Sequence, residues 1–271
     1  MGILNAVILG IVQGLTEFLP VSSSGHLVLL QKIFGISEPS LFFDTMVHAG
    51  TLLAVFAVLW QDIWAILRRL IQPLTGLLIL ATIPAVIAAL AFKHTIEDAF
   101  ESGQFLGWSF LATTALLVVA ELLSKRARIG VGLKKAEDMN WLDALIIGIL
   151  QAVAISPGLS RSGATIAGAL SRRLDRNFAA RFSFLMSIPA ILGAVVLQFK
   201  DLVRDGVVAE SGGIGAAAVI AGMVSAAVVG FFAIKLMLKI IRERSLFGFA
   251  IYTAVLGTLV LVDQFVTHLV F

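Results

Sequence analysis

Residues 13–26 read QGLTEFLPVSSSGH, and residues 151–163 read QAVAISPGLSRSG. Each stretch is a polar break, rich in proline, glycine and serine, between two short apolar segments. Several residues recur at one offset of 138 positions: Gly10 with Gly148, Gln13 with Gln151, Ser22 with Ser160, Ser24 with Ser162 and Gly25 with Gly163. In an apolar chain, a duplicated helix–break–helix unit predicts a site inside a membrane, at the interface of two repeats.

The composition places that unit in a lipid environment. The 271 residues are 59% hydrophobic and 14% charged, with a mean hydropathy of +1.01. Soluble domains carry about 25% charged residues, so we expect an all-α polytopic membrane protein. The absence of cysteine excludes disulfides, thiolate metal sites and a cysteine nucleophile. The start of the chain has no basic segment followed by a small-residue cleavage site, so no cleaved signal peptide is expected. A net charge of +3 gives no reason to expect a nucleic-acid partner.

The apolar segments fall into two length classes. A span of roughly 30 Å of hydrocarbon needs about 20 residues. Six stretches are long enough: 42–67, 74–92, 105–123, 182–199, 214–238 and 248–268. Four are too short and flank the breaks: 3–18, 24–35, 141–155 and 163–173. These short pairs predict two re-entrant hairpins, because irregular backbone at membrane depth must be buried or line a wet cavity.

The order of these segments predicts a topology. Three spans separate the hairpins, so residues 1–125 and 140–271 form two inverted pseudo-repeats of one membrane domain, 1–271, joined by a linker, 126–139. The side that holds the linker receives 15 lysines and arginines, and the side that holds the termini receives four, Lys32, Lys93, Lys200 and Arg204. The positive-inside rule therefore predicts a cytoplasmic linker, with both termini outside. The outer loops also carry acids: Glu97, Asp98, Glu101, Asp201, Asp205 and Glu210.

The first break supplies candidate acid–base groups. Gln13 and Glu17 are four residues apart, so they share one helix face. A carboxylate in an apolar segment needs a cation, a metal or water. The Glu17 carboxylate therefore either takes part in catalysis or has a structural role, in which it caps the hairpin or pairs with Arg161. One of Ser22, Ser23 and Ser24 is expected to cap the second helix, where free N–H groups favour an anion. His26 is either a general acid–base, paired with a serine nucleophile, or a hydrogen-bonded core residue.

The second break supplies positive charge. The guanidinium of Arg161 offers a bidentate fork to phosphate oxygens, unless it serves only as an ion-pair partner of Glu17. Ser160, Ser162 and Thr165 add hydroxyls, and Gly158 and Gly163 allow close backbone approach. Four further polar residues are weaker candidates: Asp44 and His48 at the mouth of a cavity, and Glu121 and Asp143, which we expect to face water at the cytoplasmic ends.

Together these motifs resemble the membrane undecaprenyl-diphosphate phosphatases of the bacitracin-resistance type. The resemblance covers the whole chain. It rests on Gln13 and Glu17; on Pro20, Ser22, Ser23, Gly25 and His26; on Pro157, Gly158, Ser160, Arg161, Ser162 and Thr165; and on residues 182–189. It implies removal of the terminal phosphate from undecaprenyl diphosphate, which recycles a cell-wall lipid carrier and confers bacitracin resistance. The work would be done at the outer face of the bacterial plasma membrane, with a divalent cation, Mg²⁺ or Ca²⁺.

The resemblance also implies roles for individual residues. Glu17, Ser23, His26 and Arg161 would be catalytic, with Ser23 attacking and His26 as its base; water activated by His26 or Glu17 is the alternative. Glu17 and Gln13 would hold the metal, although Gln13 stands where many members have glutamate, which leaves one carboxylate. The residues expected to bind the substrate are Ser22, Ser24, Gly25, Gly158, Ser160, Ser162 and Thr165.

Other functions remain open from the sequence. Inverted repeats with broken helices are also typical of carriers, so a flippase for polyprenyl phosphate is the main alternative. A second lipid-phosphatase superfamily is echoed by Ser24-Gly25-His26 and Ser160-Arg161, but it needs a distant histidine, and only His268 follows Arg161. A purely structural protein would leave both polar breaks unexplained. The expected partners are a polyprenyl diphosphate and membrane lipids, and the sequence leaves a homodimer open.

Overall fold

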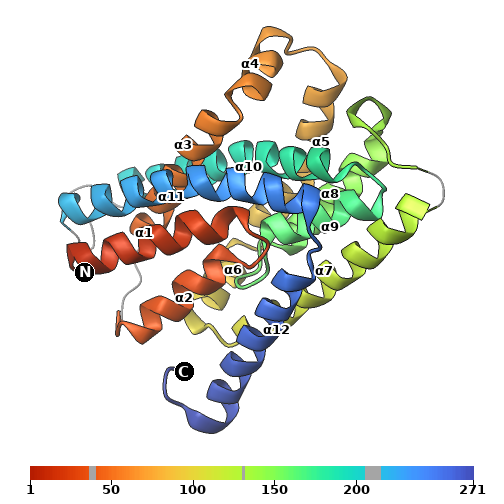
Figure 1. Cartoon of the computed structure of the whole chain (residues 1–271). Helices are drawn as coiled ribbons and strands as arrows, with labels where there is room; N and C mark the ends of the chain where they lie inside the picture. Colours follow the sequence, from red (N-terminus) through yellow and green to blue (C-terminus); the bar gives the residue numbers. More distant parts are fainter. Residues whose placement is uncertain (37–40, 130–131, 205–214) are drawn as a thin grey trace.

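The computed structural model describes residues 1–36, 41–129, 132–204 and 215–271, and over these ranges the chain is helical apart from turns and one isolated bridge between Lys134 and Leu174. The α-helices are α1 (Ile3–Phe18), α2 (Ser23–Ile33), α3 (Leu41–Val58), α4 (Trp60–Arg68), α5 (Pro73–Ala91), α6 (Lys93–Ser102), α7 (Leu106–Ile129), α8 (Trp141–Val153), α9 (Arg161–Ser171), α10 (Arg176–Arg204), α11 (Ala216–Glu243) and α12 (Phe247–Val262) (Figure 1). A short 3₁₀ helix, η1 (Ala136–Asp138), lies before α8, and a π-helical segment, η3 (Asp263–Thr267), follows α12.

The predicted class, an all-helical multi-pass membrane protein, is confirmed. Five helices are long and apolar enough to cross a membrane, and the bent pair α3–α4 makes a sixth candidate among the described residues. The four short helices, α1, α2, α8 and α9, flank the two breaks. Two predicted outer acids, Asp205 and Glu210, lie outside the described residues, as do part of the linker (130–131) and the side chains of Glu97, Glu101, Asp201, Arg128 and Arg204.

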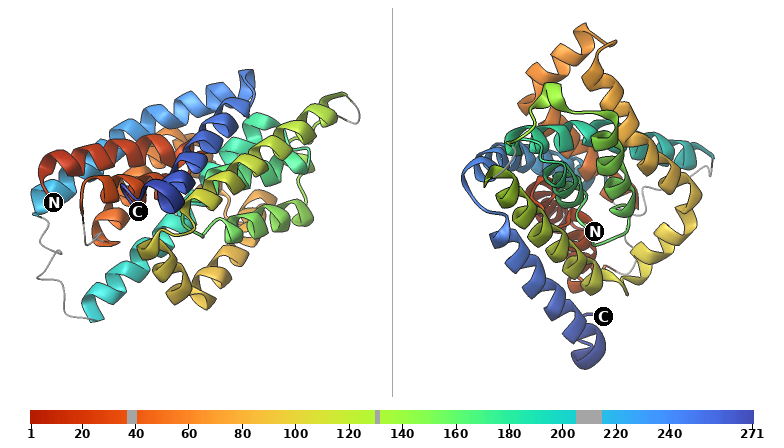
Figure 2. Two further views of the ribbon diagram at one scale, coloured as in Figure 1. Left: turned by 90° about the horizontal axis from the view of Figure 1, so that it is seen from below. Right: turned by 90° about the vertical axis from the view of Figure 1, so that its right-hand side faces the viewer.

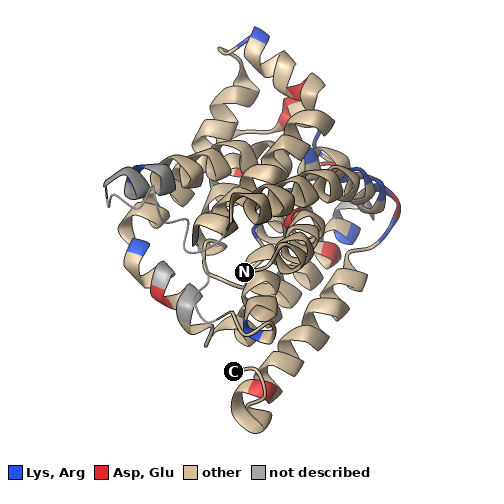
Figure 3. Ribbon diagram, turned by 90° about the vertical axis from the view of Figure 1, so that its left-hand side faces the viewer, with Lys and Arg blue, Asp and Glu red and all other residues tan. Residues whose placement is uncertain are grey.

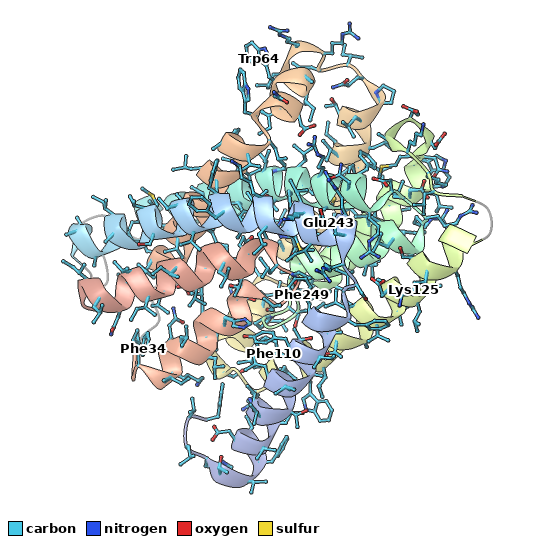
Figure 4. All side chains as sticks on the ribbon, viewed as in Figure 1. Phe34, Trp64, Phe110, Lys125, Glu243 and Phe249 are labelled. Atoms are coloured by element: carbon cyan, nitrogen blue, oxygen red, sulfur yellow. The ribbon has the colours of Figure 1, made fainter. Side chains whose placement is uncertain are left out.

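The span predicted at 42–67 is bent instead of straight. The chain turns by 78° between α3 and α4, at the buried Leu59. Asp62, in the first turn of α4, forms an ion pair at 3.0 Å with Arg181 on α10. This partly exposed pair links α4 to α10, while Trp64 on the opposite side of α4 is exposed (Figure 4). Hydropathy averages over both faces of a helix, so it does not reveal such a bend.

The helix before each break packs against a span of the other half of the chain. α1 runs along α11 (Figure 1), and α8 packs against α5. A methyl group added to Gly10 would collide with the carbonyl oxygen of Gly222, and one added to Gly148 would collide with that of Ala81. The two glycines that share the repeat offset therefore make the same kind of backbone contact in both halves. α7 and α12, the last span of each half, lie side by side (Figure 2).

Glu121 and Asp143, which were expected to face water, are buried instead. Arg176 on α10 donates to Glu121 at 2.9 Å and also binds the carbonyl of Ile241. Asp143 accepts from Lys134 of the linker and from Arg172 after α9. The expectation was wrong because basic residues near the linker fold back onto these carboxylates. Most other charges lie toward the ends of the helices (Figure 3).

Candidate active site

The tips of the two breaks meet inside the helix bundle. The backbone N–H of Gly158 donates to Ser24 Oγ at 3.3 Å, and Ser162 Oγ donates to the carbonyl of Leu19 at 3.1 Å. A Cβ built on Gly25 would lie 3.1 Å from Gly158 Cα. Segments more than 130 residues apart in sequence are thus in direct contact, so that their polar side chains share one space.

Both breaks start their second helix with the same serine cap. Ser22 Oγ accepts from the N–H of Gly25 at 3.2 Å, and Ser160 Oγ accepts from the N–H of Gly163 at 3.0 Å. Such caps satisfy one of the free donors at a helix N-terminus. The predicted capping serine of the first break is therefore Ser22, whose hydroxyl is bonded to the backbone at the start of α2.

Glu17 is the centre of the polar cluster. Its carboxylate is buried at the end of α1, and its Oε1 forms an ion pair with Arg161 Nη2. Its Oε2 accepts from Ser23 Oγ at 2.6 Å and from Gln13 Nε2 at 2.9 Å. His48 Nε2 lies 3.6 Å from the same oxygen. Acid, hydroxyl, guanidinium and imidazole thus come together from α1, α2, α9 and α3.

This cluster forms one wall of a cavity of about 310 Å³. Its polar lining includes side chains from both breaks: Glu17, Ser23, Ser24, Ser160, Arg161 and Ser162. Part of the lining comes from α10 and is apolar: Ala190, Ile191, Ala194 and Val195. Arg161 keeps 19% of its side chain exposed, in addition to its pair with Glu17. The ion pair and a ligand contact are therefore compatible in one site.

Asp44 and His48 line the same cavity. The sequence alone had not decided whether they belong to it. His48 Nδ1 donates to the carbonyl of Asp44 at 2.6 Å, since a carbonyl oxygen only accepts. Its Nε2 is consequently the nitrogen that faces Glu17. The Asp44 carboxylate accepts from Gln31 Nε2 at 2.8 Å. The four-residue spacing in the first turns of α3 was the available signal for this pair.

His26 lies elsewhere than the sequence suggested. Its Nδ1 is bonded to the carbonyl of Ser22 at 2.6 Å, and its Nε2 to the hydroxyl of Tyr252 at 2.7 Å. The ring stacks on Tyr252 and meets the edge of Phe110. The expected pairing of His26 with Ser23 is thus wrong, because both ring nitrogens have other partners and the Ser23 hydroxyl is bonded to Glu17. Tyr252, the single tyrosine of the chain, gave no sequence signal.

Four predicted substrate contacts do not line the cavity. Ser22 is buried and caps α2. Thr165 is fully buried and bonds Ser183 on α10 at 2.6 Å. Gly25 faces Phe110, and Gly158, at φ +83°, faces Leu106. Both glycines are needed because a Cβ would lie within 3 Å of these side chains on α7. They bring the two breaks and α7 close together.

The oxygen ligands suit a hard divalent cation, but they are few. Among the described residues, no group of three or more acidic, histidine or cysteine side chains is placed to hold a metal. However, Gln13 Oε1 is buried without a partner, beside Glu17. A buried acceptor without a partner is costly, and a cation would satisfy it. Mg²⁺ usually takes one or two protein oxygens, together with water and substrate phosphates. The residues therefore fit such an ion if the substrate supplies further ligands.

Long apolar helices around a cavity with polar and apolar lining define a multi-pass membrane protein with a candidate site inside its helix bundle. The chain belongs to the family described as bacitracin resistance protein BacA, whose family model matches residues 6–259. It is 47% identical over 264 residues to an undecaprenyl-diphosphatase of Carboxydothermus hydrogenoformans, across 97% of this chain and 98% of that one. It is 46% identical over 265 residues to undecaprenyl-diphosphatase 3 of Bacillus cereus, across 98% of each chain. An undecaprenyl-diphosphatase of Methanosphaera stadtmanae is 38% identical over 284 residues, across 97% of this chain and 98% of that one.

Proposed function

We propose that the protein is a membrane undecaprenyl-diphosphatase, which hydrolyses undecaprenyl diphosphate to undecaprenyl phosphate and inorganic phosphate. The names of its relatives supply the substrate. The observation that carries the proposal is the hydrogen bond of 2.6 Å from Ser23 Oγ to Glu17 Oε2, beside Arg161 in a cavity with both polar and apolar lining. This arrangement places a hydroxyl, a proton acceptor and a phosphate-binding cation within one space.

Polar and apolar parts of the cavity lining bind different parts of the substrate. Arg161, Ser24 and Ser162 bind the diphosphate oxygens, helped by the N-terminal N–H groups of α2 and α9. The apolar residues of α10 lie where the first isoprene units leave the diphosphate. Phosphoryl transfer depends mostly on positioning and charge stabilisation, so a fixed guanidinium is the expected main contribution.

The chemical step uses Ser23 as nucleophile. Its Oγ bonds to the terminal phosphorus while its proton passes to Glu17 Oε2, and the bond from that phosphorus to the bridging oxygen breaks. Undecaprenyl phosphate leaves. Water then attacks the phosphoserine; Ser23 Oγ departs with the proton held by Glu17, and inorganic phosphate forms as one proton goes to solvent. Glu17 replaces His26 as the proton acceptor, because the Ser23 hydroxyl donates to Glu17. Direct attack by water activated by Glu17 is the alternative.

A divalent cation, Mg²⁺ or Ca²⁺, would be held by Glu17 and Gln13 Oε1 and would neutralise charge on the phosphate oxygens. Gln13 Nε2 donates to Glu17 and orients its carboxylate.

The site is proposed to open toward the outer face of the bacterial plasma membrane, with both termini outside and the linker in the cytoplasm. The excess of basic residues on the linker side supports this orientation. The matched contacts of Gly10 and Gly148 support two inverted repeats with re-entrant hairpins. The chain has no cysteine, so single cysteines at the exposed Ile71 and Ser102 test the orientation. A membrane-impermeant maleimide should label Ser102→Cys from outside and leave Ile71→Cys unlabelled in intact cells.

The activity is tested by release of inorganic phosphate from a polyprenyl diphosphate by the purified protein in detergent, with and without a chelator. Phosphate release that stops with the chelator supports the proposed activity and its need for a divalent cation. Recycling of the cell-wall carrier and bacitracin resistance are the cellular consequences that we propose for this activity. Translocation of polyprenyl phosphate in vesicles without phosphate release would favour a flippase and overturn it.

A further inference from the structure

A partly buried aromatic bridge joins the first turn of α2 to α12. His26 on α2 forms a hydrogen bond of 2.7 Å with Tyr252, a residue 226 positions further along the chain. The two rings are stacked with centroids 5.7 Å apart and an interplanar angle of 7°. Phe110 on α7 packs edge-on against the imidazole, with the ring centroids 5.5 Å apart. Figure 4 labels Phe110, which lies in that view between the ribbons of α2 and α12. Packing from three helices thus fixes the imidazole ring.

The bridge ends on a strained residue. Ser22 has φ +74°, in a region that residues other than glycine rarely adopt. Such a conformation persists only where the surroundings hold it. Two contacts do so: Ser22 Oγ caps the N–H of Gly25, and the carbonyl of Ser22 accepts from His26 Nδ1 at 2.6 Å. Ser23, the next residue, has its hydroxyl on Glu17. The strained turn therefore sets the direction of the proposed nucleophile.

The hydrogen bonds decide which nitrogen of His26 carries the proton. The Ser22 carbonyl only accepts, so Nδ1 carries the hydrogen. Nε2 of the neutral ring is then an acceptor, and the Tyr252 hydroxyl donates to it. Tyr252 is 46% exposed, whereas His26 is 8% exposed and does not line the cavity. The ring is therefore placed to hold the backbone and not to touch the substrate.

We infer that Tyr252 is a positioning residue, which fixes the tautomer and orientation of His26 and thereby keeps the Ser22–Ser23 turn aimed at Glu17. This inference rests on the proposed function, since it assigns a role in presenting Ser23. Loss of the Tyr252 hydroxyl leaves the phosphate-binding side chains in place. It should therefore lower kcat while KM changes little.

Tyr252→Phe tests this, because it removes the hydroxyl and keeps the stacked ring. We expect kcat about tenfold lower and KM within about twofold of wild type, which corresponds to loss of one buried hydrogen bond. Thr258→Val is the matched control: it also removes a hydroxyl from α12, but one that bonds only its own helix, at Ala254. This variant should retain wild-type kinetics. A thermal melt within a few degrees of wild type checks that each variant is folded.

Two further measurements separate positioning from mere packing. The ¹⁵N resonance of His26 Nε2, assigned by its loss in His26→Asn, should move toward the position of a free acceptor in Tyr252→Phe. The double variant, with Tyr252→Phe and His26→Asn together, should be no slower than His26→Asn alone, since both changes break one chain of contacts. Additive losses, or a wild-type kcat in Tyr252→Phe, would overturn the inference.

The Nε2 resonance also keeps this inference apart from the proposed function. If the wild-type protein releases no phosphate, the enzyme proposal fails, whereas the resonance still reports the hydrogen bond to Tyr252. If the wild-type protein is active and the Nε2 resonance does not move in Tyr252→Phe, only the positioning role fails.

Discussion

Replacing Glu17 by glutamine is the sharpest test of the cluster, because the change keeps the shape of the side chain and alters only its charge and hydrogen bonding. Every hydrogen bond of the Glu17 carboxylate comes from a donor: Arg161 on Oε1, and Ser23 and Gln13 on Oε2. Whichever way the amide of Glu17→Gln is turned, its NH₂ group must face at least one of these donors. The variant also loses the group proposed to accept the Ser23 proton.

The size of the effect follows from these contacts. Loss of a general base typically lowers the rate by about 10²- to 10⁴-fold. Each lost hydrogen bond to a charged group removes a further stabilisation of about 1.5–3 kcal/mol from the site. We therefore expect phosphate release to fall by at least about 10³-fold. Breaking a fully buried pair costs about 3–5 kcal/mol of stability. Arg161 retains contact with the cavity, so a smaller loss is expected, with a thermal midpoint lowered by only a few degrees.

The assay is phosphate release from a polyprenyl diphosphate by purified protein, with thermal unfolding followed in the same detergent. Glu137→Gln is the matched control, because Glu137 is an exposed glutamate in the linker. It should behave as wild type. Turnover above a tenth of wild type in a folded Glu17→Gln variant would refute the role of Glu17 as hub and proton acceptor.

Three further changes probe other parts of the site and the fold. Ser23→Ala should abolish turnover, and wild-type protein quenched early should carry phosphate on Ser23; substantial turnover by Ser23→Ala would leave direct attack by water. Arg161→Ala should insert and fold but lose nearly all activity, and wild-type turnover would rule out the phosphate contact. Gly10→Ala should destabilise the protein by about 1–3 kcal/mol, because its methyl group collides with backbone on α11. Gly76→Ala is its control, since a Cβ at Gly76 meets nothing within 4 Å, and equal melting of these two variants would contradict the close contact of α1 and α11.

Much of the helical framework could be read from the sequence, because helix length and helix breaks depend on local properties. About 20 apolar residues are needed to span the hydrocarbon, and proline, glycine and serine interrupt such segments. Every end of the short helices α1, α2, α8 and α9 lies within two residues of the expected bound. The bend at Leu59 was missed, because a local pattern does not show how α4 lies against distant parts of the chain; Asp62 on α4 pairs with Arg181, 119 residues away.

Part of the candidate site was likewise predicted from the sequence, and part was not. The repeat and the polar breaks predicted that Glu17, Ser23 and Arg161 would come together, and these residues are in contact. The direction of His26 and Thr165 was not predictable. Successive helical residues differ by about 100° around the axis, so a small rotation of a short helix decides whether a side chain enters the cavity or faces α12 or α10.

The sequence by itself determined that this is a duplicated, membrane-embedded helical protein with two polar breaks, because composition, length and spacing are properties of neighbouring residues. Only the tertiary structure decided which groups share the cavity, which nitrogen of His26 carries the proton, and that Tyr252 holds the imidazole. The physical reason is that these choices depend on contacts between helices far apart in the chain, and a local pattern does not specify how two helices are rotated against each other.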